Sequence, residues 1–598
     1  MFKCLTYSLL LTFAITSATS ITARGQLPTI SADSIRLNQV GFYPNAGKIA
    51  VVLSGKPHKF IILKGDNEQV FAGTLKASAQ PDLAGRVTYI ANFTALQMRG
   101  RYRLAIPEMG ASYPMEIKPG IHAQAAAASI KAFYYQRASI ALPQKHAGKW
   151  ARPMGHPDDK VLIHPSAATE KRPAGTVISS PRGWYDAGDY NKYVVNSGIS
   201  MGTLLSLYED FPDYMKTVRL NIPESTNQVP DVLDETLWNL RWMLTMQDPN
   251  DGGVYHKLTN AAFDAMIMPD KATTPRYVVQ KGTAATLDFA AVMAQASRVY
   301  KAYNKPLPGL SDSCLKAAVQ AWQWALANPN VAYNQDAMNT RFKPEVSTGA
   351  YGDQHFEDEF TWAATELYIT TLNDAYLKGA NATNARFNIP SWPQVNTLGY
   401  YSLLRNRTKL TPAGKALIPA LQAQLITFAS NLMKGWNNTA YETVMGKTAK
   451  DFGWGSNSNA ANQGIALLQA YLLTGKNEYA DAALSNLDYL LGRNGTGYCY
   501  ESGFGRKPIM HPHHRPSIAD GIAEPVPGLL SGGPNPGRQD KVELPSLIPN
   551  QAFVDNDQAY AVNEIAINWN APFAYLINAI EALQYKRGYS AVSNKQGH

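Results

Sequence analysis

The 598-residue sequence predicts two domains, a small β-sandwich followed by a large and mainly helical domain. Short β-like runs separated by turn residues fill residues 31–120, whereas apolar residues at helical spacing dominate residues 121–590. A chain of this length also exceeds one ordinary domain. These observations together favour a compact β module attached to a helical domain.

The first 23 residues read as a removable secretion signal. Lys3 supplies a short positive segment, residues 5–15 are apolar, and small residues follow at Ala18 and Ala23. This apolar run is too short for a membrane span, and no later stretch approaches 18 uninterrupted apolar residues. We therefore expect a secreted or periplasmic protein without a membrane span. Because Cys314 and Cys499 are then the remaining cysteines, disulfides are not its main support.

The β-like runs of the first domain are KIAVVLSG, KFIILKG, EQVFAGTL, RVTYIANF and RYRLAIP. Gly, Pro, Asn and Asp separate them at a spacing of roughly 8–12 residues, which is typical of a small β-sandwich. Such a module either binds a ligand or packs on its neighbour, and we favour packing.

The second domain alternates helical segments with irregular loops. In VLDETLWNLRWMLTMQD, for example, Leu233, Leu237, Leu240 and Leu244 share one helical face. No strand runs are evident after Gly120, so we expect the loops between helices to build the site. The Pro- and Gly-rich stretch 523–550 is the longest of these loops.

Composition narrows the choice of partner. The formal net charge is +9, but no run of Lys or Arg accompanies it, so we expect no nucleic-acid binding. The chain contains 32 Tyr and 11 Trp, and the flat apolar faces of these side chains suit sugar rings as well as protein cores.

Two acidic clusters in aromatic surroundings predict the chemistry. GWYDAGDYNKYVV places Asp186 three residues before Asp189, and FVDNDQAYAVNEIAINWNA contains Asp555 and Glu564. Hydrolysis of a glycosidic bond with inversion requires a protonated acid on one side and a carboxylate base on the other, with space for water between them. Distant segments can supply such a pair. The alternatives are an Asx turn or helix cap at Asp186 and a solvated helix position at Glu564.

A third cluster, GFGRKPIMHPHHRPS, holds His511, His513, His514 and Arg515. The spacing of its histidines fits no common structural zinc site. Hydrogen bonds from these side chains to sugar hydroxyls are the favoured interpretation, and an ordinary surface loop is the alternative.

These three motifs resemble the signatures of glycoside hydrolase family 9, a family of inverting cellulases. DGGVYHKLT, MPDKATTPRYV, YGDQHFEDEFTWAATELY and PVPGLLSGGPNPGRQD resemble it as well, and LNQVGFYP resembles the start of its N-terminal immunoglobulin-like module. The resemblance implies an immunoglobulin-like β-sandwich followed by an (α/α)6 barrel with an open cleft. It also implies hydrolysis of β-1,4-glucosidic bonds in cellulose-like β-glucans, with endo action favoured.

Three alternatives stay open. The enzyme acts on xyloglucan or mixed-linkage glucan, it acts from chain ends as a glucosidase or glucosaminidase, or the chain is a non-catalytic carbohydrate-binding protein. The resemblance also implies roles for single residues. Asp189 corresponds to the general base, Asp186 to its partner on the nucleophilic water, and Glu564 to the general acid. Supporting or sugar-binding positions are Asp555, His513, Arg515, Trp184, Tyr185, His256, Trp454 and Tyr560.

The same resemblance bears on metals and partners. Calcium is possible near FEDEF, with Asp353, Asp358 and Glu359 as ligands, although acidic residues at a helix N-terminus are equally natural there. Some relatives carry a Cys/His zinc site, but its two cysteine positions match Ala138 and Gly155, and only His156 is retained. We therefore expect no zinc. We also expect that the chemistry requires no cofactor and that the protein is a monomer.

Overall fold

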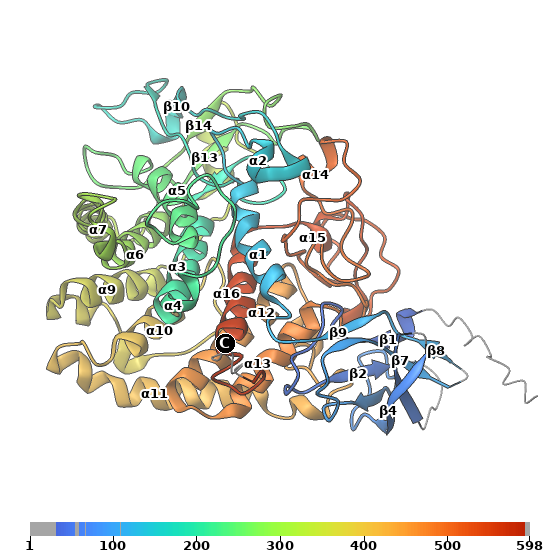
Figure 1. Ribbon diagram of the computed structural model, residues 1–598. Coiled ribbons are helices and arrows are strands. Elements are labelled where there is room, and N and C mark those ends of the chain that lie inside the picture. Colours follow the sequence, from blue (N-terminus) through green and yellow to red (C-terminus); the bar gives the residue numbers. More distant parts are fainter. Residues whose placement is uncertain (1–31, 54–58, 66, 108, 592–598) are drawn as a thin grey trace, which may run out of the picture.

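A computed structural model describes residues 32–53, 59–65, 67–107 and 109–591, and its first domain is a β-sandwich of two antiparallel sheets (Figure 1). The expected secretion signal, residues 1–23, lies outside the described residues. One sheet has the order β1 (Ile35–Arg36), β2 (Ile49–Val52), β6 (Tyr89–Asn92) and β5 (Lys76–Ala77). The other has the order β4 (Glu68–Thr74), β3 (Lys59–Lys64), β7 (Gly100–Ile106) and β8 (Gly110–Ala111), with β9 (Met115–Ile117) paired to β7.

The alternation of side chains along β7 shows why these residues form a sandwich. Tyr102 and Leu104 point into the core, whereas Arg101 and Arg103 are exposed. The inward residues pack with Phe42 and other apolar side chains from both sheets.

The second domain is helical, as the sequence predicted. Its longer helices are α1 (Ala123–Tyr135), α3 (Val194–Asp210), α5 (Asp231–Thr245), α6 (Thr283–Tyr300), α7 (Leu310–Ala327), α9 (Glu357–Thr371), α10 (Asn396–Asn406), α11 (Pro412–Met433), α12 (Ser456–Thr474), α13 (Asn477–Leu490) and α16 (Ile567–Leu583). The shorter ones are α2 (Gln144–Ala147), α4 (Pro212–Met215), α8 (Gln335–Arg341), α14 (Arg515–Ala519) and α15 (Tyr560–Asn563).

The burial of each helix distinguishes an inner from an outer layer. Helices α3, α6, α12 and α16 are buried on nearly every side, and α3 packs between α16 and α6. In contrast, α11 buries a single stripe that includes Ile418, Leu421 and Leu425. A helix that is apolar all round belongs in the interior, and a helix with one apolar stripe covers it. This division into inner and outer helices agrees with the expected (α/α)6 barrel.

A buried polar network ties several helices together. Asp210, at the end of α3, accepts hydrogen bonds from Arg405 of α10 at 2.7 Å, from Gln469 of α12 at 2.9 Å and from Tyr575 of α16 at 2.5 Å. Next to it, Glu209 pairs with Arg298 of α6 at 2.8 Å. Because each charge has a partner, burial of this network is tolerated, and it fixes the helices relative to one another.

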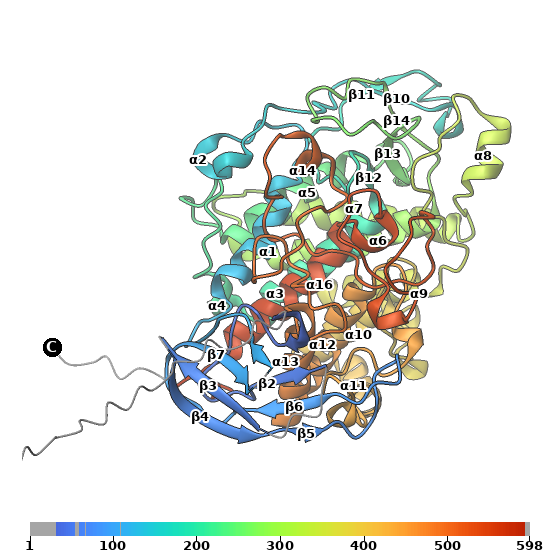
Figure 2. The same cartoon turned by 90° about the vertical axis from the view of Figure 1, so that its right-hand side faces the viewer.

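The expectation of no strands after Gly120 is wrong. A five-stranded sheet in the order β11 (Val177–Ile178), β10 (Val161–Ile163), β14 (Arg276–Val278), β13 (Lys257–Asn260) and β12 (Lys192–Tyr193) lies at the far end of the molecule from the sandwich (Figure 2). Its strands are two to four residues long, too short to produce a recognisable alternation. The sheet matters for the site because β12 begins three residues after Asp189.

The two domains are joined by polar contacts. Gln39 donates a hydrogen bond to the carbonyl of Gly497 at 2.7 Å and accepts hydrogen bonds from the backbone N–H groups of Arg506 and Lys507 at 2.9 and 2.8 Å. Asn38 donates to Asp488 at 2.8 Å. The favoured role of the sandwich, packing on its neighbour, agrees with these contacts.

One described helix, Pro412–Asn438, is long and apolar enough to cross a membrane by length and composition, with a mean hydropathy of 1.2. Its most apolar window is 22% buried in the fold. A lone helix of this kind is weak evidence for a membrane span, because core helices pass the same test.

Candidate active site

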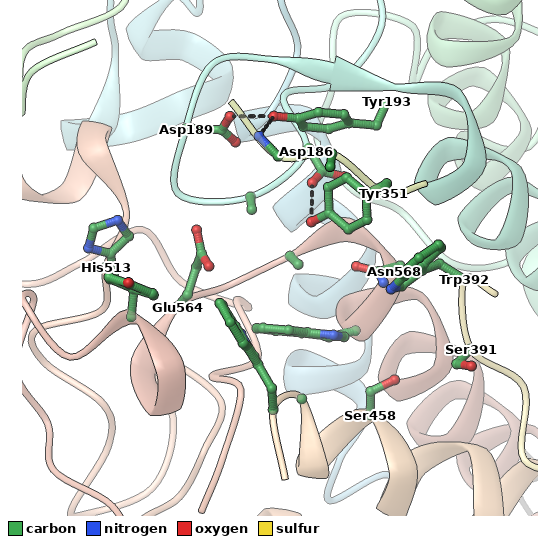
Figure 3. A pocket seen from close by; sticks show the side chains of 18 of the residues that line it. Asp186, Asp189, Tyr193, Tyr351, Ser391, Trp392, Ser458, His513, Glu564 and Asn568 are labelled. Atoms are coloured by element: carbon green, nitrogen blue, oxygen red, sulfur yellow. Dashed lines mark hydrogen bonds between the residues drawn. The ribbon is translucent and has the colours of Figure 1, made fainter. Parts of the chain in front are cut away.

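A cavity of about 940 Å³ lies where the loops of the helical domain converge (Figure 3). Its walls come from segments far apart in the sequence. The lining residues include Asp186, Asp189, Tyr193, Phe263, Thr348, Gly349, Tyr351, Ser391, Trp392, Trp454, Ser458, His513, Arg515, Tyr560, Glu564, Asn568 and Trp569. The three carboxylates that the sequence assigned to chemistry therefore share one cavity.

The loop that carries both aspartates is fixed by contacts with the later motifs. Ala187 forms a β-bridge with Ala566, and the N–H of Ile567 donates to the carbonyl of Asp186 at 2.8 Å. A Cβ on Gly188 would lie 2.1 Å from the carbonyl oxygen of His513. Only glycine permits this approach, so the DAGD loop depends on the residue between its two acids.

Asp186 is buried, and its carboxylate is fully engaged. The Asn196 side chain donates to Oδ1 at 2.9 Å and to Oδ2 at 3.0 Å, and the Tyr351 hydroxyl donates to Oδ2 at 3.1 Å. Burial raises the pKa of Asp186 well above its ordinary value, and the negative charge of Asp189 acts in the same direction.

Asp189 is held differently. Asn191 donates to its Oδ2 at 2.5 Å and the Tyr193 hydroxyl donates to the same oxygen at 3.2 Å. Within the described part of the chain, Oδ1 has no hydrogen-bond partner, and it is not enclosed. One oxygen is therefore fixed while the other is free to accept a hydrogen bond from water.

Glu564 follows the short helix α15 and points toward the side of the cavity that holds the two aspartates (Figure 3). Removal from bulk water raises its pKa well above the ordinary value, and the negative charges of Asp189 and Asp186 raise it further. The backbone N–H of Gly188 and the charge of Arg515 oppose this shift. These effects favour the protonated form of Glu564, which a general acid requires.

His513 and Arg515 reach the cavity from the His/Arg cluster. The Nδ1–H of His513 donates to the carbonyl of Asp557 at 2.6 Å. The other ring nitrogen, Nε2, takes no part in this hydrogen bond. Burial lowers the pKa of His513 below its ordinary value. Arg515 donates to the carbonyls of Gly188 at 2.8 Å and Asp264 at 2.9 Å. Arg515 therefore lines the cavity and also fixes the position of the DAGD loop through its hydrogen bond to Gly188.

Aromatic rings form much of the remaining wall. Trp454 is 48% exposed and lies next to Tyr560, with ring centroids 5.7 Å apart, and both were expected to bind sugar. Sequence reasoning missed Tyr351, Trp392 and Trp569. Trp392 lies in the Pro390–Ser–Trp–Pro393 turn. A tryptophan between prolines, outside any helical pattern, was the available signal.

Three sequence assignments are corrected by their positions. The side chains of Trp184 and Tyr185 have no exposed surface, so neither can stack on a sugar ring. Trp184 donates to Glu235 at 2.9 Å, and the Tyr185 hydroxyl contacts His156 at 2.8 Å. His256 is buried behind the cavity and contacts the carbonyl of Ala350 at 2.8 Å.

Asp555 does not line the cavity. Its carboxylate accepts hydrogen bonds from the backbone N–H groups of Met510 at 2.8 Å and His511 at 2.9 Å, and from the Asn563 side chain at 2.9 Å. Asp555 thus joins the His/Arg cluster to the segment of Glu564 and acts on the site only through them.

The predicted calcium ligands lie in an acidic cluster that also includes Asp288 of α6. Both carboxylate oxygens of Asp288, both of Glu359 and one of Asp353 are buried without a hydrogen-bond partner, whereas Asp358 accepts from the N–H of Val395 at 2.7 Å. Burial and neighbouring negative charges raise the pKa of Glu359 to about 12. Hard carboxylate oxygens of this kind suit calcium. No group of three acidic, His or Cys side chains in the described ranges is already gathered as a metal site.

The positions matched to a zinc site in relatives carry one suitable donor here, His156, and no thiolate. Ala138 is buried against Tyr185 and Tyr190, and a Cβ on Gly155 would lie 2.5 Å from Pro269. His156 is engaged with the Tyr185 hydroxyl. Because zinc requires several thiolate or imidazole ligands, this set does not fit it.

Comparison with known proteins identifies the family. A model of glycosyl hydrolase family 9 matches residues 122–577, and a model of the cellulase N-terminal ig-like domain matches residues 31–111. The chain belongs to glycosyl hydrolase family 9. The family expected from the three motifs is thereby confirmed, as is its two-domain architecture.

Two relatives that cover most of the chain are named as endoglucanases. A xyloglucan-specific endo-β-1,4-glucanase of Bacteroides ovatus is 45% identical over 574 residues, covering 96% of this chain and 97% of the relative. Endoglucanase D of Acetivibrio thermocellus is 34% identical, covering 91% of this chain and 82% of the relative. The chain is therefore a glycoside hydrolase of the endo-β-1,4-glucanase kind and not a non-catalytic binding protein.

Solved structures agree with this placement. A Bacteroides ovatus family 9 structure superimposes with a TM-score of 0.88 at 45% identity, covering 92% of this chain and 99% of that one. A structure of AaCel9A in complex with cellobiose-like isofagomine superimposes with a TM-score of 0.82 at 30% identity, again covering 92% and 99%.

Proposed function

We propose that this chain is an inverting, endo-acting hydrolase of β-1,4-glucan backbones, with Glu564 as general acid and Asp189 as general base. The observation that carries the proposal is the cavity that Glu564 shares with Asp186 and Asp189. Glu564 lies more than 370 positions after both aspartates in the sequence. The environment of Glu564 favours the protonated form, which an acid requires. Oδ1 of Asp189 is free to receive a proton from water.

In this mechanism the chain residues move two protons. Glu564 donates its proton to the glycosidic oxygen as the bond to the anomeric carbon breaks. Asp189 accepts a proton from the water that attacks this carbon from the opposite face, so the new hydroxyl has the inverted configuration. Asp186, held by Asn196 and Tyr351, orients the water and remains unchanged at the end. The product leaves with Glu564 ionised and Asp189 protonated, and one proton exchange with solvent resets the site.

Xyloglucan is a second candidate for the preferred substrate. The relative named as xyloglucan-specific shares 45% identity with nearly the whole chain, whereas the relative named endoglucanase D shares 34%. A cavity with two exposed aromatic side chains, Phe263 and Trp454, suits a substrate that offers extended sugar faces. The backbone linkage is the same in both candidates, so the roles of the carboxylates do not depend on this choice.

A product time course on the purified enzyme tests the proposal. Carboxymethyl cellulose, mixed-linkage glucan, xyloglucan and cello-oligosaccharides should be compared by viscosity and by chromatography of the products. We expect a rapid fall in viscosity with mixed oligosaccharides, and the fastest hydrolysis with xyloglucan if the second candidate holds. Release of single sugars from chain ends at constant viscosity would contradict endo action. Proton NMR of the first product would contradict inversion if the original anomer appeared.

The variant Glu564→Gln tests the role of Glu564 as the general acid. The amide is similar in size but carries no transferable proton, so hydrolysis of polymer should be abolished while binding persists. A 2,4-dinitrophenyl cellotrioside, whose leaving group needs no proton, should still be cleaved. Near-normal turnover of unactivated glucan by this variant would contradict the assignment of Glu564.

We also propose a structural calcium ion held by Asp288, Asp353, Asp358 and Glu359. The five buried oxygens without partners support this proposal, because a cation would compensate their desolvation. Bound calcium would stabilise the fold and would take no part in the reaction. Export of the mature chain and a monomeric state stay predictions from the sequence.

A further inference from the structure

A buried lysine lies directly behind the proposed base. Lys257 is on β13, has no exposed surface, and is paired in register with Tyr193 of β12. The hydroxyl of Tyr193 donates to Oδ2 of Asp189 at 3.2 Å. The lysine side chain passes beneath this ring, with Nζ 5.5 Å from its centroid. One aromatic ring thus separates a buried ammonium group from the carboxylate that takes the proton from water.

The ammonium group is fully satisfied, and none of its acceptors is a carboxylate. Nζ donates to Oε1 of Gln335 at 2.7 Å, to Oγ1 of Thr348 at 3.1 Å and to the carbonyl of Gly349 at 2.7 Å. An ammonium group has three N–H donors, so each has one acceptor. Burial of a charge without an ion-pair partner is costly, and its presence therefore calls for a reason beyond packing.

Two of the three acceptors belong to the loop that forms one wall of the cavity. Thr348 and Gly349 both line the cavity, and the N–H of Gly349 donates to the Tyr193 hydroxyl at 3.1 Å. Two residues further on, Tyr351 donates to Asp186 at 3.1 Å. The lysine therefore ties down a segment that supplies or orients hydrogen bonds to both aspartates.

We propose that Lys257 is a positioning residue of the reaction, whose ammonium group holds the Thr348–Tyr351 loop and the Tyr193 hydroxyl where they orient Asp189 and Asp186 toward the nucleophilic water. The inference rests on the proposed roles of these aspartates. A neutral amine has two N–H donors for the same three acceptors and carries no charge. Loss of the proton from Lys257 therefore releases one contact of the loop and removes a positive charge that interacts with Asp189.

The titratable groups around Lys257 make this proton loss visible near neutral pH. Burial lowers the pKa of Lys257 to about 7, and the negative charge of Asp189 opposes the shift. Burial also lowers the pKa of the adjacent His256 to about 3, so this ring stays neutral. The pKa values of Tyr193 and Tyr333, whose rings flank the ammonium group, are raised above their ordinary value. Lys257 is thus the group in this cluster that changes charge as the pH rises from 6 to 9.

Lys257→Met tests the proposal, because methionine keeps most of the length of the side chain and removes all donors. The substrate is a 2,4-dinitrophenyl cellotrioside, so that deprotonation of Glu564 does not limit the rate at high pH. In the wild type we expect kcat to fall above the pKa of Lys257 and to level off no lower than in Lys257→Met, because the neutral amine keeps two donors. In Lys257→Met we expect kcat to be roughly tenfold to a hundredfold lower at pH 6, with KM little changed and no alkaline fall.

Lys48→Met is the matched control. Lys48 is another fully buried lysine without a carboxylate partner, and it donates to the carbonyls of Pro44 at 2.6 Å and Ala46 at 2.9 Å in the sandwich. Burial lowers its pKa to about 8. Its loss should lower the melting temperature but leave kcat and the alkaline fall of the wild type unchanged.

A second variant keeps the test decisive if Lys257→Met does not fold. Gln335→Leu removes one acceptor of Lys257 and the hydrogen bond from Gln335 to the Thr348 carbonyl at 2.7 Å, and it should lower kcat in the same direction but by less. An alkaline fall retained in Lys257→Met, or wild-type kcat in a folded variant of either residue, would overturn the inference. Failure of the wild type on every glucan, or full activity of Asp189→Asn, would instead overturn the proposed function.

Discussion

The hydroxyl of Tyr351 donates a hydrogen bond to Oδ2 of Asp186 at 3.1 Å, although the two residues are 165 positions apart. Tyr351 has a φ angle of 48°, a left-handed conformation that a bulky residue rarely adopts. Its ring packs edge-on against Trp392, with centroids 5.4 Å apart. A strained backbone in this position is retained because the surrounding contacts fix it, and strain of this kind concentrates at functional sites.

Replacement of Tyr351 by Phe should lower kcat. The hydroxyl is one of two side-chain donors to Asp186, and an ordinary hydrogen bond contributes about 0.5–1.5 kcal/mol, which corresponds to a loss of roughly twofold to tenfold. Steady-state kinetics on xyloglucan and carboxymethyl cellulose would measure it. Tyr401→Phe is the control, because the Tyr401 hydroxyl is buried without a partner and its removal should leave kcat unchanged. Equal kinetics in the two variants would contradict a role for the Tyr351 hydroxyl.

Trp454 should contribute to binding and not to the chemical step. Its ring is 48% exposed at the cavity and lies beside Tyr560, so it offers a platform for a sugar ring. Trp454→Ala should raise KM for oligosaccharides by roughly fivefold or more, with a smaller change in kcat. Isothermal calorimetry with a cello-oligosaccharide, in the Glu564→Gln background to prevent hydrolysis, would measure the affinity directly. Leu547→Ala, at another exposed apolar side chain, serves as the control.

The sequence predicted the carboxylates and the family because each motif combines acidic and aromatic residues within a short stretch. DAGD and the segment around Glu564 each place an acid in an unusual apolar and aromatic setting. The same reasoning failed for Trp184 and Tyr185, which precede Asp186 directly. Neighbours in sequence need not face the same cavity, and here the chain turns these two side chains into the core.

The sequence did not predict the residues that reach the site only because of the topology of the fold. Tyr351 and Trp392 lie on loops between helices, and nothing local marks them as neighbours of Asp186. Lys257 lies on a strand of four residues, too short to be recognised as a strand. The order of these short strands places it behind Asp189, and this order depends on pairings between segments about 65 residues apart.

Removal of calcium should destabilise the enzyme. A bound ion stabilises the folded state by RT ln(1 + [L]/Kd), about 2.7 kcal/mol at a concentration of 100 Kd. Dialysis against a chelator should therefore lower the melting temperature, and added calcium should restore it while magnesium restores it less. Asp288→Asn should weaken this response, because Asp288 has two buried oxygens without partners. An identical melting temperature with and without calcium would contradict the calcium site and leave shared protons as the compensation for these carboxyl groups.

Glu501 offers a test of buried charge that is independent of the cavity. It has no exposed surface, both of its carboxylate oxygens lack a partner, and burial raises its pKa well above the ordinary value. The folded state therefore keeps the proton at pH values where the unfolded chain releases it, near pH 4.3. The resulting contribution to the free energy of unfolding is fully present below that pH and is lost as the pH rises. Glu501→Gln stays neutral at every pH, so it should raise the melting temperature at pH 8 and change it little at pH 4. Differential scanning calorimetry at both pH values measures the difference, and an equal shift at the two would show that Glu501 is ionised, or already compensated, in the folded enzyme.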